Sequence, residues 1–175
     1  MATNKQDTLV NLYSHSVGTI NSWKVRDIAN GAIVASTPID NYTIVELDFD
    51  TEGNRIAKQL SDVTKKQYLI ASPERRYLGE DITEFYNGIG EKARIIVLDE
   101  GVRFETSAFS LNAGVTEVEK GNVAHFDPTS KKFIISKASS PHASYSNAST
   151  KFTVVGDIED TAGNFILETV RLEVQ

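Results

Sequence analysis

The feature that most constrains the fold is a series of short segments with the pattern of β-strands, which begins near residue 32 and continues to residue 174. Residues 42–49 alternate in polarity, as a half-buried strand does. The side of this strand that is predicted to face the core carries Thr43, Val45, Leu47 and Phe49. Glycine, asparagine and proline, which favour turns, separate such segments.

Later segments repeat the pattern in pairs joined by turns. Residues 94–111 predict two strands around a turn at 99–101, and residues 152–174 predict a strand, a turn at 161–164 and a long closing strand. Strands joined by short turns pair antiparallel. The sequence therefore predicts a mainly β fold, a compact antiparallel β-sandwich or a barrel-like domain.

One segment has the period of a helix. Ile82, Phe85, Tyr86 and Ile89 recur at spacings of three and four residues, with acidic residues before them and glycines after them. The pattern predicts one short helix over residues 81–89, so the fold class is β-rich α+β.

The length of 175 residues fits one domain. Residues 1–30 have no clean period and are predicted to form an extended or loosely packed N-terminal arm, while residues 31–175 form the β-rich domain. The side chains expected to anchor the arm on a partner are Leu9, Leu12, Tyr13 and Trp23.

Composition argues against several classes of protein. The chain has 24 acidic and 18 basic residues, and the basic residues are scattered, whereas nucleic-acid binding requires clustered cations. It has no cysteine, which excludes disulfides, zinc thiolate sites and a cysteine nucleophile. No segment resembles a signal peptide or approaches about 18 consecutive apolar residues, so we expect synthesis in the cytosol and no membrane partner.

The stretch from residue 118 to 138 could form either a catalytic or metal-binding site or a β-hairpin, because His125 lies two residues before Asp127. Residues 123–126 and 133–136 read as strands, and Asp127 with Pro128 is typical of the turn between them. A metal site needs three or four ligands, and this hairpin supplies two. The hairpin is the better interpretation.

Other candidate sites have simpler explanations. The three histidines accompany no nucleophile elbow of the G-x-S-x-G kind. The carboxylates at 157–160 lack the glycine and distal glutamate of a Ca²⁺ loop, and the glycines at 88–90 lack the spacing of a phosphate-binding loop. We therefore expect no enzyme activity, no catalytic residue, no metal and no cofactor.

Two loops have distinctive compositions. Arg75, Arg76 and Tyr77 form a basic and aromatic cluster of a kind enriched at protein interfaces, although a salt bridge to Glu74 or Glu80 is the simpler interpretation. Residues 137–151 are rich in serine and alanine and are predicted to form a surface loop in which His142 is solvated.

From about residue 71 to 136 the chain resembles small structural proteins of tailed-bacteriophage virions. Residues 108–136 resemble an element of lambda-type head-decoration proteins, in which a lead strand precedes a K-G-x-V turn and a short hairpin. The matching positions are Lys120, Gly121 and Val123, followed by Phe133–Ile135. This chain is longer than that family and carries the predicted helix, which leaves trimerisation and the docking position open.

The resemblance implies a capsid decoration, or cement, protein. Such a protein would bind the major capsid protein or other virion proteins on the outside of the head, would reside in the virion, and would be expected to form a homo-oligomer. A tail or head-fibre component is an alternative within virions. A carbohydrate-binding β-domain is an alternative of another class, which would require the exposed aromatic side chains to share one sheet face.

Overall fold

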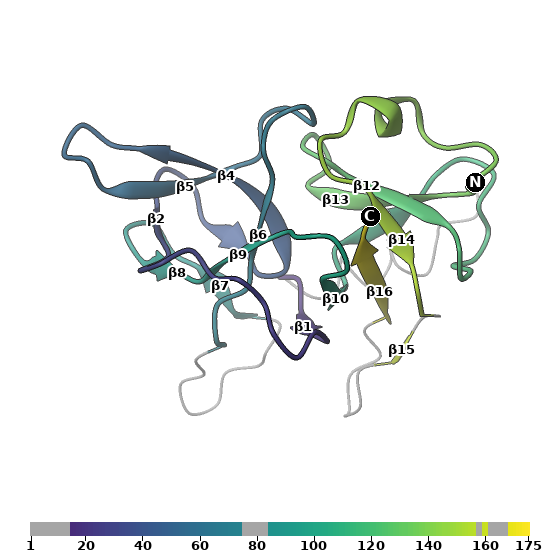
Figure 1. Ribbon diagram of the computed structural model, residues 1–175, viewed down its shortest axis with the longest axis horizontal. Coiled ribbons are helices and arrows are strands. Elements are labelled where there is room, and N and C mark those ends of the chain that lie inside the picture. The colour runs from purple at the N-terminus through teal and green to yellow at the C-terminus, as the bar shows by residue number, and fades with distance from the viewer. Residues whose placement is uncertain (1–14, 75–83, 157–158, 161–167) are drawn as a thin grey trace.

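The computed structural model describes residues 15–74, 84–156, 159–160 and 168–175 of the 175-residue chain. Within these ranges the protein is mainly β, as predicted, with two main sheets that pack against each other (Figure 1). The predicted β-rich domain is therefore confirmed as a fold class, and each sheet follows from the strand patterns described above.

The first sheet has six strands and closes almost into a barrel. Its strands, in spatial order, are β8 (Lys92–Ala93), β2 (Ala32–Val34), β5 (Arg55–Gln59), β4 (Thr43–Phe49), β6 (Tyr68–Ile70) and β9 (Ile95–Val97). All neighbours are antiparallel except β2 and β5. Only Arg94 separates the two edge strands β8 and β9 in sequence, so the sheet must curl until its edges approach each other.

The second sheet has eight strands. Along its main path these are β1 (Gly18–Ile20), β10 (Arg103–Thr106), β16 (Glu168–Val174), β14 (Phe152–Val154), β12 (Val123–Asp127), β13 (Lys132–Ser136) and β11 (Phe109–Leu111), and β15 (Glu159–Asp160) pairs with β16. The predicted hairpin is β12 and β13, with Phe126 opposite Phe133. Asp127 accepts a hydrogen bond from the Ser130 backbone N–H at 2.8 Å, as a turn residue should.

Two hydrophobic cores lie on the two faces of the barrel wall. Ile44 and Val45 are consecutive residues of β4 and both are fully buried, since side chains alternate between faces along a strand. Val45 packs inside the barrel with Ala32, Val34, Ile39, Ala57, Ile70, Ala93 and Ile95. Ile44 packs outward against the eight-stranded sheet, in a core that includes Phe104, Phe126, Phe133 and Phe152.

Residues 15–30 are packed onto both sheets. Val17 is 3% exposed, and its N–H donates to Ser107 Oγ at 2.9 Å. The Ser16 hydroxyl donates to the carbonyl of Asn41 at 2.5 Å, and β1 pairs with β10. This part of the N-terminal segment therefore connects the barrel to the second sheet, while residues 1–14 lie outside the described residues.

The helix predicted over residues 81–89 is wrong over the part that the structure describes. Tyr86–Asn87 form strand β7, which pairs antiparallel with β3 (Ile39–Asp40). Tyr86 is 44% exposed and Ile89 is 57% exposed, so the apolar residues that suggested the helix do not share a buried face. Tertiary pairing with β3 overrides a weak local preference here.

The assignment of Phe49 to the core is also wrong. The β4–β5 hairpin extends beyond the barrel (Figure 1), and β4 pairs with β6 only over residues 43–45. Phe49 lies in the extended part, is 61% exposed, and has the Arg55 guanidinium over its ring at 5.5 Å. Alternation of polarity places a residue on a face of the strand but does not show how far along the strand the barrel core extends.

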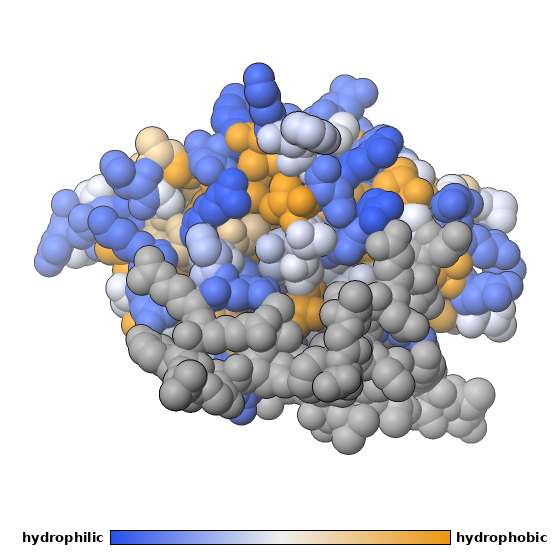
Figure 2. All heavy atoms as spheres, turned by 90° about the horizontal axis from the view of Figure 1, so that it is seen from below, coloured by the Kyte–Doolittle hydropathy of each residue, from blue (hydrophilic) through white to orange (hydrophobic). Residues whose placement is uncertain are grey.

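No helix among the described residues is long and apolar enough to cross a membrane. Figure 2 shows one face of the molecule, on which hydrophilic side chains project around the rim and hydrophobic ones lie between them. Apolar surface in this view is thus interrupted by polar side chains.

Candidate functional site

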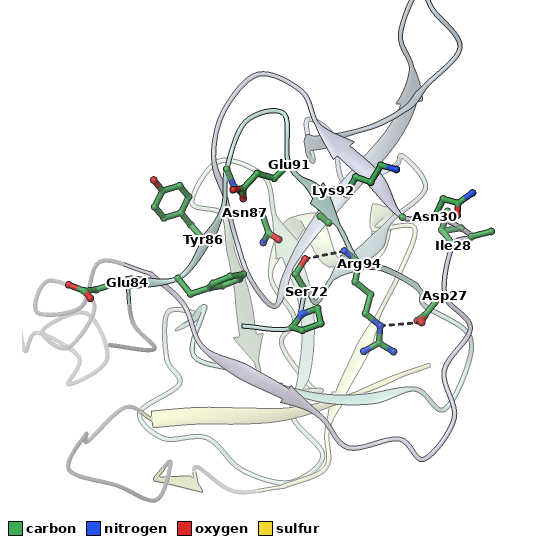
Figure 3. A pocket seen from close by; sticks show the side chains of 16 residues that line it. Asp27, Ile28, Asn30, Ser72, Glu84, Tyr86, Asn87, Glu91, Lys92 and Arg94 are labelled. Carbon is green, nitrogen blue, oxygen red and sulfur yellow. Dashed lines mark hydrogen bonds and ion pairs between the residues drawn. The ribbon is translucent and has the colours of Figure 1, made fainter. Parts of the chain in front are cut away.

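A groove of about 1150 Å³ lies on the barrel. Four short segments line it: residues 27–31 before β2, residues 72–73 after β6, residues 84–88 around β7, and residues 91–94 around β8. Figure 3 shows Glu84 and Tyr86 at one end of the groove and Asp27 and Asn30 at the other. The groove is therefore built from the connections between strands, which is where binding residues commonly lie.

Backbone conformation shapes the groove wall. Asn30 and Gly31 adopt positive φ angles of 63° and 61°, which reverse the chain just before β2. A side chain on Gly31 would collide with the carbonyl of Ala93, so β2 can approach β8 only because residue 31 is glycine.

The polar side chains of the groove are largely engaged in holding its walls together. Arg94 joins two walls, because its Nε donates to Asp27 at 3.1 Å and its backbone N–H donates to Ser72 Oγ at 3.0 Å (Figure 3). Glu91 accepts a hydrogen bond from the Gly88 N–H at 2.8 Å, and Asn87 donates to the Ile39 carbonyl at 3.1 Å. Such an arrangement can bind a ligand surface, but it does not present a nucleophile paired with a base.

A histidine and carboxylate pair lies beside the groove. His15 Nδ1 is 2.7 Å from Asp40 Oδ1, and the His15 ring lies 4.8 Å from the ring of the groove residue Tyr86. Among the described residues no hydroxyl group hydrogen-bonds to the other nitrogen of His15. Sequence reasoning missed this contact, because residue 15 and residue 40 meet only through the packing of the N-terminal segment.

A second histidine cluster lies on the eight-stranded sheet. His125 projects from β12 and is fully buried, and the ring of His142 stacks on it at a centroid distance of 5.1 Å. Tyr145 approaches edge-on at 6.2 Å. His142, which was expected to be solvated, is half-buried, because the polar loop folds into a 3₁₀ helix, η2 (Ala143–Asn147), against the outer face of β12.

Burial governs the protonation of His125. The pKa of His125 is lowered from 6.5 to about 4, mainly because the ring is removed from water; His142 also lowers the pKa, and Asp127 raises it. Burial alone would raise the pKa of Asp127, but hydrogen bonds from Ser130 and Thr129 outweigh burial and lower it. No group of three or more metal-binding side chains occurs in the described part of the chain.

Trp23 is the most exposed large apolar side chain of the described residues. Its relative exposure is 102%, so no neighbour covers the indole. The segment that carries it is fixed on both sides: the Asn21 N–H donates to the Arg103 carbonyl at 3.0 Å, and the Val97 N–H donates to the Arg26 carbonyl at 2.8 Å. The protein thus presents an uncovered tryptophan on an anchored backbone.

The other predicted contact residues lie elsewhere. Leu9, Leu12, Tyr13, Arg75, Arg76 and Tyr77 lie outside the described residues. Trp23, Tyr68 and Tyr86 lie on three separate segments, namely the connection between β1 and β2, strand β6 and strand β7. The structure therefore describes one of the predicted partner-binding residues, and it adds the groove and the two histidine contacts that the sequence did not indicate.

Comparison with known proteins gives the origin of the chain. The YonC prophage protein family matches residues 11–175. The SPbeta prophage-derived protein YonC of Bacillus subtilis (strain 168) is 52% identical over 175 residues, which cover 99% of this chain and 98% of that relative. No solved structure matches the chain. The phage origin implied by the sequence resemblance is thereby confirmed, and the chain belongs to the YonC prophage protein family.

Proposed function

We propose that the protein is a structural component of a phage particle, and most specifically a capsid decoration protein that binds the outside of the head and stabilises it. The observation that carries this proposal is Trp23, which is 102% exposed on a segment anchored at both ends. Tryptophan is among the residues that contribute most binding energy at protein interfaces. An indole held in place before binding also loses little conformational freedom on docking.

Three further observations support the proposal. The chain belongs to a prophage family, so a role in a phage particle fits its origin. The two sheets share one hydrophobic core, which gives the rigid body that a cement protein needs. The groove residues Arg94, Glu91 and Asn87 are engaged in structural hydrogen bonds, which fits a protein that acts by binding and without catalysis or a cofactor.

A decoration protein does not require tight binding by each copy. Many copies on one lattice add their contacts, so a modest interface around one tryptophan suffices when the copies bind together. Contacts between neighbouring copies, and thus a homo-oligomer on the capsid surface, belong to the same proposal. The protein would be made in the host cytoplasm and carried in the virion.

The first test is co-sedimentation of the purified protein with expanded, empty capsids of the phage that encodes it. We expect saturable binding by the wild type and at least about tenfold weaker binding by Trp23→Ala, because loss of a central interface tryptophan commonly costs 2 kcal/mol or more. Phe49→Ala is the matched control, since Phe49 is also an exposed aromatic residue but lies on the β4–β5 hairpin.

Fluorescence gives a second readout of the same event. Trp23 is the only tryptophan in the chain, so a blue shift of the emission on mixing with capsids reports burial of this side chain. If Trp23→Ala binds capsids as tightly as the wild type does, Trp23 is not part of the interface. Wild-type binding to tails or fibres, with none to capsids, would replace the decoration role by a tail role.

A further inference from the structure

The polar segment 137–149, called here the cover segment, lies over the outer face of β12 (Figure 1). Near its middle, the His142 N–H donates to Ser136 Oγ, on the last residue of β13, at 3.1 Å. At its end the Ser149 N–H donates to the Val63 carbonyl at 2.8 Å, and the Ser149 hydroxyl donates to the Lys65 carbonyl. Val63 and Lys65 precede β6 of the barrel, so the cover segment ties the two sheets together from outside.

The inner side of the cover segment rests on the buried side chain of His125. His125 is fully buried, and among the described residues neither of its ring nitrogens has a partner. A buried polar group without a partner is costly, and a buried charge without a partner is far more costly. The closed arrangement therefore depends on His125 being neutral.

The surrounding charges do not compensate for a proton on His125. The nearest ring is that of His142, a second group that can become positive, stacked at 5.1 Å. The cover segment also brings Tyr145, and β14 is preceded by Lys151, whose ammonium lies 5.4 Å from the Tyr145 ring. Asp127 on the same strand favours the charged form of His125, but Lys132 lies opposite Asp127 across the hairpin.

We propose that the cover segment is an acid-released latch, and that protonation of His125 opens it. When His125 becomes charged, the ring gains more from water than from its buried position. The cover segment then leaves β12, and the bonds from Ser149 to Val63 and Lys65 break. The external tie between the two sheets is thus present at neutral pH and lost in acid.

The direction of the pH dependence follows from linkage. The pKa of His125 is about 4 in the closed state, against 6.5 for an unburied histidine. A lowered histidine pKa means that the closed state is fully favoured above about pH 6.5 and loses stability as the pH falls toward 4. One proton taken up on opening raises the opening constant about tenfold per pH unit, or roughly 300-fold across this window.

The test uses hydrogen exchange of the full-length protein between pH 7.5 and 4.5, with rates divided by the intrinsic rate at each pH. We expect protection of the Ser149 and Tyr145 amides to fall about tenfold per pH unit below about pH 6, while the amides of β4 stay protected. In His125→Phe, which keeps a ring at this position and cannot be charged, this loss should disappear. His15→Gln is the control, because His15 pairs with Asp40 elsewhere and its removal should leave the loss unchanged.

Two results would overturn the proposal: a pH dependence of Ser149 protection that is the same in His125→Phe as in the wild type, or protection that stays constant to pH 4.5. If His125→Phe does not fold, NMR titration of the wild-type ring decides the matter. Protonation of His125 at the same pH as the loss of Ser149 protection supports the latch, and protonation while the segment stays closed contradicts it.

Discussion

At Gly18 the chain passes so close to its neighbours that no side chain fits. A Cβ atom there would collide with the carbonyl of Glu105 and would lie 2.5 Å from Cγ of Tyr42. Glu105 belongs to β10 of the second sheet, and Tyr42 directly precedes β4 of the barrel. Gly18 thus permits the N-terminal segment to pass between the two sheets.

We predict that Gly18→Ala lowers the free energy of unfolding by about 1–3 kcal/mol or more, because backbone and a packed ring must both move. Chemical denaturation measures the change. Gly53→Ala is the matched control: residue 53 has a φ of 83° but open space around its Cβ position, so its cost is backbone strain of about 1 kcal/mol. Equal losses in the two variants would contradict the close approach at Gly18.

Single residues also show what the sequence can predict about the candidate sites. The role of Asp127 in the turn followed from local chemistry, because Asp before Pro favours a turn. The burial of His125 did not follow, since it depends on His142 and Tyr145, which reach β12 only after the polar segment folds over it. The exposure of Trp23 likewise depends on which surfaces the rest of the chain leaves uncovered.

Strands β10 and β16 are joined by charged pairs on the outer face of their sheet. Glu105 stands opposite Arg171, with Arg171 Nε donating to Glu105 Oε1 at 2.8 Å, and Asn21 also donates to that oxygen at 2.9 Å. Arg103 forms a second ion pair with Glu173 on the same two strands. Glu105 is 7% exposed, so its pair is shielded from water more than an ordinary surface salt bridge.

We predict that Glu105→Gln destabilises the protein by about 1–3 kcal/mol, because hydrogen bonds to a charged group are lost in a shielded site. Combined with Arg171→Met, the cost should be smaller than the sum of the two single changes, since the double variant leaves no unpaired charge. Thermal unfolding of the wild type, the two single variants and the double variant measures the coupling energy between Glu105 and Arg171. Additive losses would show that the Glu105–Arg171 pair contributes no more than an exposed ion pair. The reference for an exposed pair is Asp99→Asn, which breaks the Arg26–Asp99 pair.

At the level of elements, the sequence predicted strands where the local pattern and the final burial agree. The β12–β13 hairpin is such a case, because its turn residues and its Phe126–Phe133 pair act locally. The helix over residues 81–89 failed because Tyr86 and Asn87 pair with Ile39–Asp40, far away in sequence. Short segments of this kind take their conformation from a partner strand that local periodicity does not reveal.

The whole molecule is held together by a core that both sheets share. Ile44 from the barrel packs in one cluster with Phe126 and Leu172 of the second sheet, and Ile44 is fully buried. Neither sheet can therefore expose this face without a large loss of buried apolar area. Which faces meet in this way could not be predicted from the sequence, because both residues 44 and 45 are apolar and both are buried.

We predict that the barrel and the second sheet unfold as one unit. Native-state hydrogen exchange should give the same free energy of opening for the amides of Val45 and Phe126, and Ile44→Ala should lower both by about 2–5 kcal/mol. A variant that loses protection at Val45 alone would show that the barrel unfolds separately.

Strand β16 lies between β10 and β14 in the middle of the eight-stranded sheet, yet it follows all the other strands of that sheet in sequence. During synthesis on the ribosome, the β1–β10 pair and the four strands β14, β12, β13 and β11 therefore stay unjoined until residues 168–174 have been made, whereas every strand of the barrel has been made by residue 97. The eight-stranded sheet is thus completed only after all strands of the barrel have been made, and until then the sheet that covers the barrel face around Ile44 is incomplete.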